Sequence, residues 1–272
     1  MSSRSRALLA LLALLALVAL LVSCGDDGRT SSTTTRAGAS TTEPARSGTI
    51  TVSAAASLTE SFEKIGADFE KAHPGTTVRF TFDSSQTLAT QIVDGAKVDV
   101  YASADEENTQ TLVDAGLVDG SPTTFARNQL VIVTQPGNPQ GIETLADLAS
   151  VDVVALCGRD VPCGKFATQV LNGAGVSIDE SKVTRGQNVK ATLTAVTEGD
   201  AVAGIVYVTD ARSAGDAVEQ VAIPDAQNAI ATYPISVLED AGAPELARAF
   251  VEFVAGTGGE RVLEELGFLA PS

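Results

Sequence analysis

The chain has 272 residues, of which 44% are apolar and 19% are charged, so it contains enough apolar residues to build a packed core. Its 18 Lys and Arg residues face 34 Asp and Glu residues, and the resulting net charge of -16 excludes the basic footprint of a nucleic-acid-binding protein. A single His and three Cys argue against His-based metal sites and haem. The composition favours an acidic globular protein.

The first 23 residues have the pattern of a secretory signal peptide. Arg4 and Arg6 precede an unbroken apolar stretch over residues 7–22, which is shorter than the ~20 residues that span a bilayer. The stretch ends in Leu21-Val22-Ser23-Cys24, which resembles the bacterial lipobox, in which the Cys is lipidated and becomes the new N-terminus. We therefore predict a lipoprotein signal peptide over residues 1–23 and a lipid anchor on Cys24, which would hold the protein on the outer face of the cytoplasmic membrane. An uncleaved signal anchor is the alternative.

Residues 24–48 form a different kind of segment. They are rich in Ser, Thr, Ala and Gly and have no apolar periodicity, so they cannot bury enough surface to become ordered. We predict a disordered tether here, with folded structure beginning near Thr49.

Two cysteines remain after Cys24 is assigned to the lipid. Cys157 and Cys163 are separated by five residues, and a secreted chain enters an oxidising compartment. We predict a disulfide between them. A zinc site is the alternative, but zinc needs further ligands and His73 is far away in sequence.

The first half of the folded part alternates strands with amphipathic helices. In chain order we expect a strand over 49–52, a helix with an apolar stripe over 58–69 that stops at His73-Pro74-Gly75, a strand over 78–82, a helix over 88–92 that ends at Gly95, a strand over 98–102 and a helix over 105–116. This alternation indicates a parallel sheet with helices on both faces.

The second half continues the alternation after an extended segment. The expected elements are that segment over 129–134, a short helix over 144–148, a strand over 151–156, helices over 163–171 and 189–196, strands over 203–208, 218–223 and 233–238, and helices over 244–254 and 258–266. A single sheet would need about ten strands, so two lobes fit the pattern better. We expect residues 129–134 and 230–237 to cross between them.

Hydroxyl-bearing or small residues follow several strands at helix starts. Ser57-Leu58-Thr59-Glu60 has the form of a capping box, and Ser57 would then cap its own helix. Similar positions occur at Ser84-Ser85, Pro162-Cys163 and Asn188-Val189, while Tyr207 ends a strand. The first turn of a helix offers free N–H groups and a positive dipole end, which together suit an anion.

These segments, taken in order, resemble the motifs of the molybdate-binding proteins of ABC transporters. The resemblance rests on Ala54-Ala55-Ala56-Ser57-Leu58, on Ser84-Ser85 with Thr87-Leu88 and Gln91-Ile92, on Val161-Pro162-Cys163-Gly164, and on Gly204-Ile205-Val206-Tyr207. It implies an α/β, two-lobed periplasmic-binding-protein fold of type II, in which each lobe is a mostly parallel sheet flanked by helices and the ligand cleft lies between the lobes. Lobe 1 would comprise residues 49–127 and 236–272, and lobe 2 residues 128–235.

The resemblance also implies a function. The protein would bind molybdate, and tungstate as well, and deliver it to an ABC transporter permease; it would be a monomer without enzymatic activity, cofactor or metal apart from that of the oxyanion. Carried over by position, Ser57 and Ser85 would each offer a hydroxyl and an N–H, Cys163 and Val189 an N–H, and Tyr207 its hydroxyl. The chain departs from the family pattern at Gln86, where a small residue is usual, and at Cys163, where Ala is common.

Other functions stay open at this point. A receptor for another tetrahedral oxyanion such as sulfate would differ only in its cavity. An extracellular serine hydrolase would use Ser57 or Ser85 with His73 as the base, and a ferric-iron receptor would need Tyr101, Tyr207 and Tyr233 to cluster. A purely structural lipoprotein would not need polar helix starts after so many strands.

Overall fold

The computed structural model describes residues 47–271. The predicted signal peptide, Cys24 and the tether up to residue 46 lie outside the described residues. The first strand begins at Gly48, one residue before the predicted start of folded structure.

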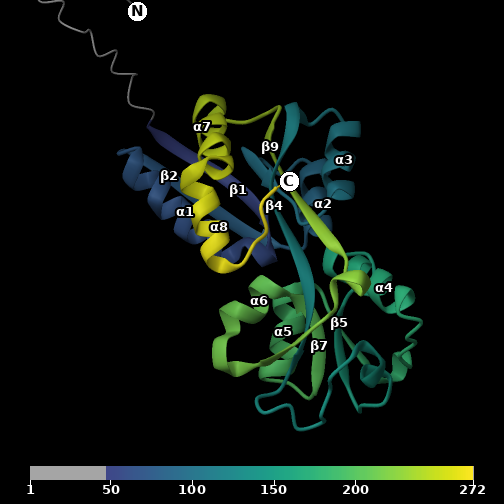
Figure 1. Ribbon diagram of the computed structural model, residues 1–272. Helices are drawn as coiled ribbons and strands as arrows, with labels where there is room; N and C mark the ends of the chain where they lie inside the picture. The colour runs from purple at the N-terminus through teal and green to yellow at the C-terminus, as the bar shows by residue number, and fades with distance from the viewer. Residues whose placement is uncertain (1–46, 272) are drawn as a thin grey trace, which may run out of the picture. The chain divides into compact units, whose positions relative to one another are not determined.

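Nine strands and eight α-helices make up the described part (Figure 1). The strands are β1 (Gly48–Ala55), β2 (Thr76–Asp83), β3 (Val100–Ala102), β4 (Val118–Thr134), β5 (Val154–Cys157), β6 (Val183–Gly186), β7 (Ala203–Tyr207), β8 (Glu219–Ala222) and β9 (Ile230–Leu238). The α-helices are α1 (Thr59–Ala72), α2 (Ser85–Val93), α3 (Glu106–Asp114), α4 (Pro162–Gly173), α5 (Val189–Thr197), α6 (Val208–Ala214), α7 (Pro244–Ala255) and α8 (Thr257–Leu266). Short 3-10 helices occur at η1 (Ala56–Leu58), η2 (Leu145–Ala149), η3 (Glu180–Lys182), η4 (Gly215–Ala217) and η5 (Asp225–Gln227).

The strands form two mixed sheets that share β4. Sheet A has the order β2-β1-β3-β9-β4, with β1 parallel to β2 and β3, and β9 antiparallel to β3 and β4. Sheet B has β4-β7-β5-β6, with β5 parallel to β6 and β7, and β4 antiparallel to β7 and β8. The expected parallel strands are therefore present in both halves, and the long strands β4 and β9 add antiparallel pairings.

Strand β4 connects the two sheets. Residues 118–129 pair with β9 in sheet A, and residues 130–134 pair with β7 and β8 in sheet B (Figure 1). The sequence pattern does not predict residues 118–128 of this strand, because the polar stretch Asp119-Gly120-Ser121-Pro122 breaks the alternation and the register shifts there. The predicted second lobe boundary, after residue 235, falls inside β9, which pairs with sheet A along its length. The division into lobes at these residues stays a prediction.

Apolar helix faces cover both sheets. In sheet A, α1, α7 and α8 pack together on one side, and α2 and α3 form a second cluster through Leu88, Ile92, Tyr101 and Leu112 (Figure 1). Phe62 and Phe69 of α1 meet Phe250 of α7 edge-to-face, with ring centroids 6.2 and 5.3 Å apart. These contacts need the amphipathic spacing that the sequence predicted for α1.

Two elements were missed by the sequence analysis, and one strand end was wrong. Strand β6 is only four residues long and half-exposed, so it lacks a hydrophobic run. Helix α6 begins at Val208, which was predicted to be the last residue of β7; Tyr207 thus stands at the junction of strand and helix.

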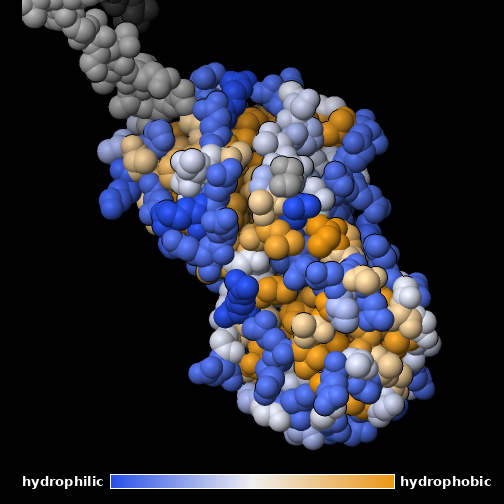
Figure 2. All heavy atoms as spheres, viewed as in Figure 1, coloured by the Kyte–Doolittle hydropathy of each residue, from blue (hydrophilic) through white to orange (hydrophobic). Residues whose placement is uncertain are grey.

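Hydrophilic residues are spread over the face shown in Figure 2, with apolar residues between them. Among residues 47–271 no helix is both long and apolar enough to cross a membrane.

Candidate functional site

Four helix starts from the two sheets meet at one small cavity. The helix starts of η1 and α2 come from sheet A, and those of α4 and α5 come from sheet B. The cavity is lined by Ala55, Ala56, Ser57, Ser84, Ser85, Ala104, Val161, Pro162, Cys163, Asn188, Val189 and Tyr207. Its volume is about 20 Å³, which is close to the roughly 10–15 Å³ that one water molecule needs and far below the roughly 300–1,000 Å³ of pockets for drug-sized ligands. The structure brings all five predicted site residues to this cavity.

Local capping explains why these residues are the first in their helices. Ser84 caps α2 by accepting a hydrogen bond from the Thr87 N–H, and Asn188 caps α5 by accepting one from the Ala191 N–H. Ser85 and Val189 are therefore the first helical residues, whose N–H groups have no intrahelical acceptor. In α4, Pro162 takes the first position, where its missing N–H costs nothing, and Cys163 follows.

Ser57 does not form the predicted capping box. It lies inside the 3-10 turn η1, and the N-cap residue that precedes this turn, Ala55, makes no side-chain cap. Glu60 turns instead to Lys190, with Nζ 2.6 Å from Oε1. The Ser57 hydroxyl lies 2.9 Å from the hydroxyl of Tyr233. The capping-box prediction was wrong because a strand residue 176 positions away supplies a partner that local sequence cannot reveal.

The Tyr207 hydroxyl is the most unusual group at the cavity. The side chain is 1% exposed, and among the described residues its oxygen has no hydrogen-bond partner. Burial, together with the nearby Tyr233 and acidic groups, raises the pKa of Tyr207 well above its ordinary value, so the phenol keeps its proton. A buried, unpaired O–H is costly, and a ligand that accepts its hydrogen bond would remove that cost.

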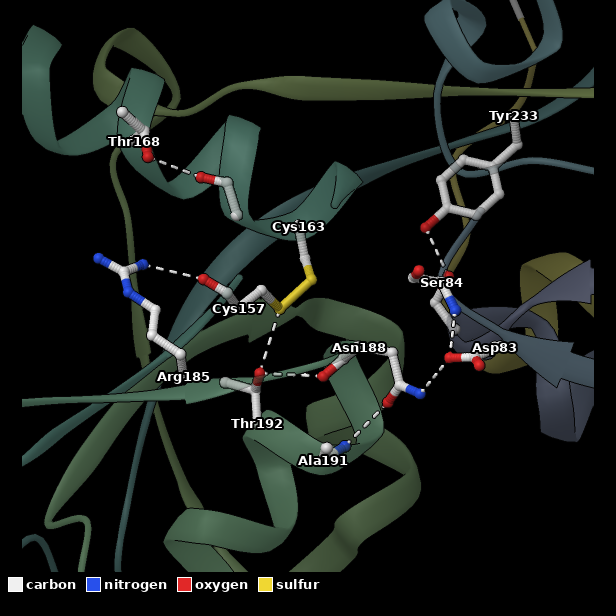
Figure 3. The surroundings of a disulfide bond; sticks show 12 residues. Asp83, Ser84, Cys157, Cys163, Thr168, Arg185, Asn188, Ala191, Thr192 and Tyr233 are labelled. Carbon is white, nitrogen blue, oxygen red and sulfur yellow. Dashed lines mark hydrogen bonds between the residues drawn. A yellow bond between two sulfur atoms is a disulfide. The ribbon is translucent and has the colours of Figure 1, made fainter. Parts of the chain in front are cut away.

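A disulfide joins Cys157 at the end of β5 to Cys163 at the start of α4 (Figure 3). The Cys157 carbonyl accepts a hydrogen bond from the Arg185 guanidinium at 2.9 Å, and the Thr192 hydroxyl lies 3.2 Å from Cys157 Sγ. The next residue, Gly164, packs so closely that a Cβ there would lie 1.8 Å from the Gly158 carbonyl oxygen. This wall of the cavity is therefore held by covalent and close backbone contacts.

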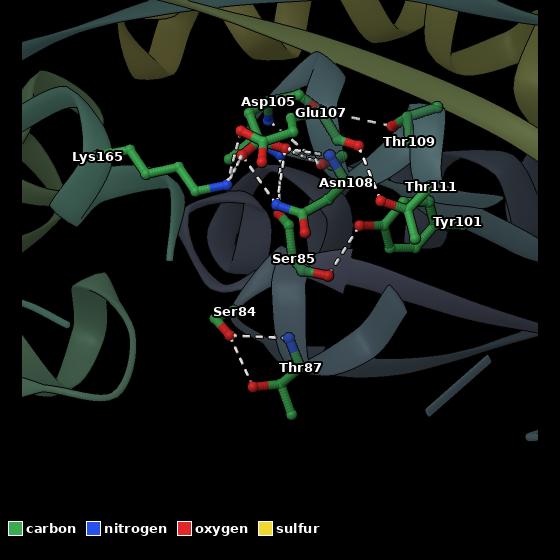
Figure 4. Close-up of polar contacts among 12 residues, drawn as sticks. Ser84, Ser85, Thr87, Tyr101, Asp105, Glu107, Asn108, Thr109, Thr111 and Lys165 are labelled. Atoms are coloured by element: carbon green, nitrogen blue, oxygen red, sulfur yellow. Dashed lines mark hydrogen bonds and ion pairs between the residues drawn. The ribbon is translucent and has the colours of Figure 1, made fainter. Parts of the chain in front are cut away.

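No residue that lines the cavity carries a charge. Two lysines lie in the helices that reach it, but both are engaged with acidic groups. Lys190 contacts Glu60 and, at 3.1 Å, the buried Asp210, while Lys165 contacts Glu107 at 2.8 Å (Figure 4). An anion in this cavity would thus meet neutral hydrogen-bond donors from hydroxyls and helix N-termini.

The geometry does not provide the base that a serine hydrolase needs. His73 terminates α1 and packs against Phe69, with ring centroids 4.4 Å apart. Ser57 precedes the other end of this 14-residue helix, about 20 Å away along its axis. Tyr101 and Tyr233 lie in β3 and β9, and the rings of Tyr207 and Tyr233 are neighbours, with centroids 6.0 Å apart. In residues 47–271 no group of three or more His, Cys, Asp or Glu side chains is arranged to hold a metal ion.

Sequence reasoning missed two polar residues that lie behind the site. Tyr233 and Asn128 are both fully buried, and the Asn128 amide reaches the Tyr233 hydroxyl. Polar side chains within apolar strands were the available signal, since such groups need partners. The sequence does not indicate that Ser57 is the partner of the Tyr233 hydroxyl.

Comparisons with known proteins agree with this architecture. Residues 50–269 match the family model described as "Bacterial extracellular solute-binding protein". The chain is 41% identical to the molybdate-binding protein ModA of Mycobacterium bovis over 252 residues, which cover 92% of this chain and 93% of that protein.

Two solved structures show the same fold. The periplasmic molybdate-binding protein of Azotobacter vinelandii aligns with a TM-score of 0.74 and 21% identity, covering 82% of this chain and all of that one. The sulfate-binding protein SubI of Mycobacterium tuberculosis aligns with a TM-score of 0.73 and 19% identity, covering 81% of this chain and 86% of that one. The two-lobed fold expected from the sequence is confirmed, and the chain belongs to the family of bacterial extracellular solute-binding proteins.

Proposed function

We propose that this protein binds molybdate, and tungstate as well, and delivers it to the permease of an ABC transporter. Membership of a solute-binding family and 41% identity to a molybdate-binding protein support the ligand class. The five residues Ser57, Ser85, Cys163, Val189 and Tyr207 are the proposed ligand-binding residues. They would hold the oxyanion without a cofactor or a resident metal.

The unpaired Tyr207 hydroxyl carries the proposal. Ser57 and Ser85 line the same cavity with their hydroxyls, and no charged side chain lines it. A fully deprotonated tetrahedral oxyanion offers acceptors in every direction and no proton, so it matches such a site. Protonated ligands would place their own proton against a donor, which is unfavourable.

Short-range donors must supply the affinity. Removal of residues 1–23 takes away Arg4 and Arg6 and changes the net charge from -16 to -18, so the protein repels an anion at long range. A hydrogen bond to a charged group contributes about 1.5–3 kcal/mol. Seven such bonds, from three hydroxyls and four N–H groups, would give roughly 10–20 kcal/mol before the costs of ordering and closure.

The N-terminal sequence supports a proposal for where the protein is located. We propose that residues 1–23 are cleaved and that a lipid on Cys24 anchors the protein on the outer face of the cytoplasmic membrane, where it acts as a monomer. Mass spectrometry of the membrane fraction would detect a lipidated N-terminal Cys24. A Cys24→Ala variant is the control, and its release from the membrane is the expected result.

Titration calorimetry with molybdate, tungstate, sulfate and phosphate tests the function. We expect tight binding of molybdate and tungstate, weaker binding of sulfate because the smaller ion cannot reach all donors together, and a molybdate-dependent rise in melting temperature. Preference for sulfate would instead assign the protein to the sulfate-type receptors. No heat and no thermal shift with millimolar molybdate would refute the proposal.

A further inference from the structure

A chain of buried hydrogen bonds lies behind Ser57. The Asn128 Nδ2 group donates to Thr209 Oγ1 at 2.9 Å and to Tyr233 Oη at 3.4 Å, and Tyr233 Oη lies 2.9 Å from Ser57 Oγ. All four side chains are at most 4% exposed.

The direction of each hydrogen bond in this chain is assigned from the atoms that carry protons. Asn128 Oδ1 accepts from the Gln129 N–H at 2.9 Å, which identifies the other amide atom as the nitrogen, and an amide nitrogen can only donate. Tyr233 Oη therefore accepts from Asn128. The contact with Ser57 Oγ by itself allows either hydroxyl to donate. Among the described residues Ser57 Oγ is the acceptor offered to the single Tyr233 proton, so we assign Tyr233 as the donor and Ser57 as the acceptor. The proton of Ser57 is then free to point elsewhere, and Ser57 lines the cavity.

Ser85 also accepts a hydrogen bond from the protein, but from a different donor. Its Oγ accepts from the Ala104 N–H at 2.9 Å, so its proton is likewise free. The neighbouring Ser84 differs, because its hydroxyl donates to Thr87 Oγ1 and accepts from the Thr87 N–H (Figure 4). Of the three serines that line the cavity, Ser57 and Ser85 therefore keep a proton for a guest, whereas Ser84 does not.

We propose that Tyr233 and Asn128 are positioning residues that hold Ser57 as a hydrogen-bond acceptor toward the protein and so make it a dedicated donor toward the ligand. This inference rests on the proposed oxyanion-binding function. Without the Tyr233 proton, the Ser57 hydroxyl can rotate and also accept a hydrogen bond from a ligand. The chain then serves selectivity, because a site that contains an acceptor tolerates protonated anions such as hydrogen phosphate.

A double-mutant cycle measured by calorimetry tests this role. In the otherwise unchanged protein, Tyr233→Phe should weaken molybdate binding about fivefold and weaken phosphate binding less, so that the molybdate-to-phosphate affinity ratio falls. In a Ser57→Ala background the same change should alter the molybdate affinity less than twofold, because no hydroxyl remains to be oriented. In a Ser85→Ala background, which is the matched control, the fivefold loss should persist.

Equal losses from Tyr233→Phe in all three backgrounds would overturn the proposal, since a general loosening of the site does not depend on Ser57. If Tyr233→Phe fails to fold, Asn128→Leu removes the donor to Tyr233 while leaving both hydroxyls, and its effect should show the same dependence on Ser57. A starting protein that does not bind molybdate at all would refute the proposed function rather than the orientation of Ser57. Binding with no coupling between positions 57 and 233 would refute the orientation alone.

Discussion

Asn188 donates a hydrogen bond from Nδ2 to Asp83 Oδ1 over 2.9 Å, although 105 residues separate the two in the chain. Asp83 ends β2 in sheet A, and Asn188 caps α5, which packs on sheet B. The same Asn188 side chain therefore positions a helix start at the cavity and ties the two sheets together beside it (Figure 3). Lys190 with Glu60 and Lys165 with Glu107 make two further ties between these halves.

The ties should favour the arrangement in which the cavity is enclosed. Glu60→Gln removes the charge pair with Lys190 but leaves the contact of Lys190 with Asp210. Because partly exposed ion pairs contribute about 0.2–1 kcal/mol, we expect molybdate affinity to fall about 1.5- to 5-fold, with a smaller difference at high salt. Calorimetry at two salt concentrations measures this. Glu63→Gln on the exposed face of the same helix is the control, and an equal effect of the two substitutions would contradict a role for the tie.

Ser57→Ala and Ser85→Ala should each weaken molybdate binding at least tenfold. Each change removes one charge-assisted hydrogen bond, and the loss of about 1.4 kcal/mol or more corresponds to that factor. Calorimetry gives the affinities, and circular dichroism should show an unchanged fold. Ser177→Ala, at an exposed position, should bind as the unchanged protein does. Unaltered affinity in both site variants would remove these residues from the binding site.

Tyr207→Phe should separate stability from binding. The substitution removes a buried hydroxyl that has no partner among the described residues, so the ligand-free protein should be as stable as before or more stable. Molybdate affinity should nevertheless fall at least tenfold. Urea unfolding without ligand and calorimetry with ligand measure the two quantities. A variant that loses stability but keeps its affinity would show that the hydroxyl has a structural role instead.

The disulfide should stabilise the fold by restricting the unfolded chain. The Cys157–Cys163 bond closes a short loop, since the two residues are six positions apart, and chain entropy predicts about 2 kcal/mol for such a loop. Replacing both cysteines by Ala, or adding reductant, should lower the urea midpoint by a corresponding amount. Reductant should have no further effect on the double variant. A midpoint that does not change under reducing conditions would contradict the prediction.

Asp210 should make stability depend on pH. Burial raises the pKa of this carboxyl from 3.8 to about 6, with Glu60 adding to the shift and Lys190 opposing it. The folded state then binds the proton more tightly than the unfolded state, so the contribution of Asp210 to stability falls as pH rises from about 4 to about 6. Asp210→Asn should lack this fall, and its free energy of unfolding should rise relative to the unchanged protein over that range. Urea unfolding at several pH values, with Asp200→Asn as an exposed control, tests this; parallel curves for all three proteins would contradict it.

Most of the local structure follows from patterns along the chain. Period-2 and helical patterns identified β1, α1, α2 and α5 because their apolar residues are spaced for one buried face, and α1 stops where His73-Pro74-Gly75 predicted, with Gly75 at φ +91°. The five candidate site residues came from a resemblance that local motifs carried. The Cys157–Cys163 pair followed from cysteine count and compartment.

Which side chains meet, in contrast, depends on how distant parts of the chain pack together. The capping role of Ser57 was wrong because Tyr233 and Lys190 compete for Ser57 and Glu60 from distant parts of the chain. Strand β4 could not be delimited because its polar half is stabilised by pairing with β9 rather than by its own pattern. The direction of the hydrogen bond at Ser57 depends on which donors lie behind it. Packing between strands that are more than 100 residues apart brings these donors together, and a local sequence pattern contains no information about such packing.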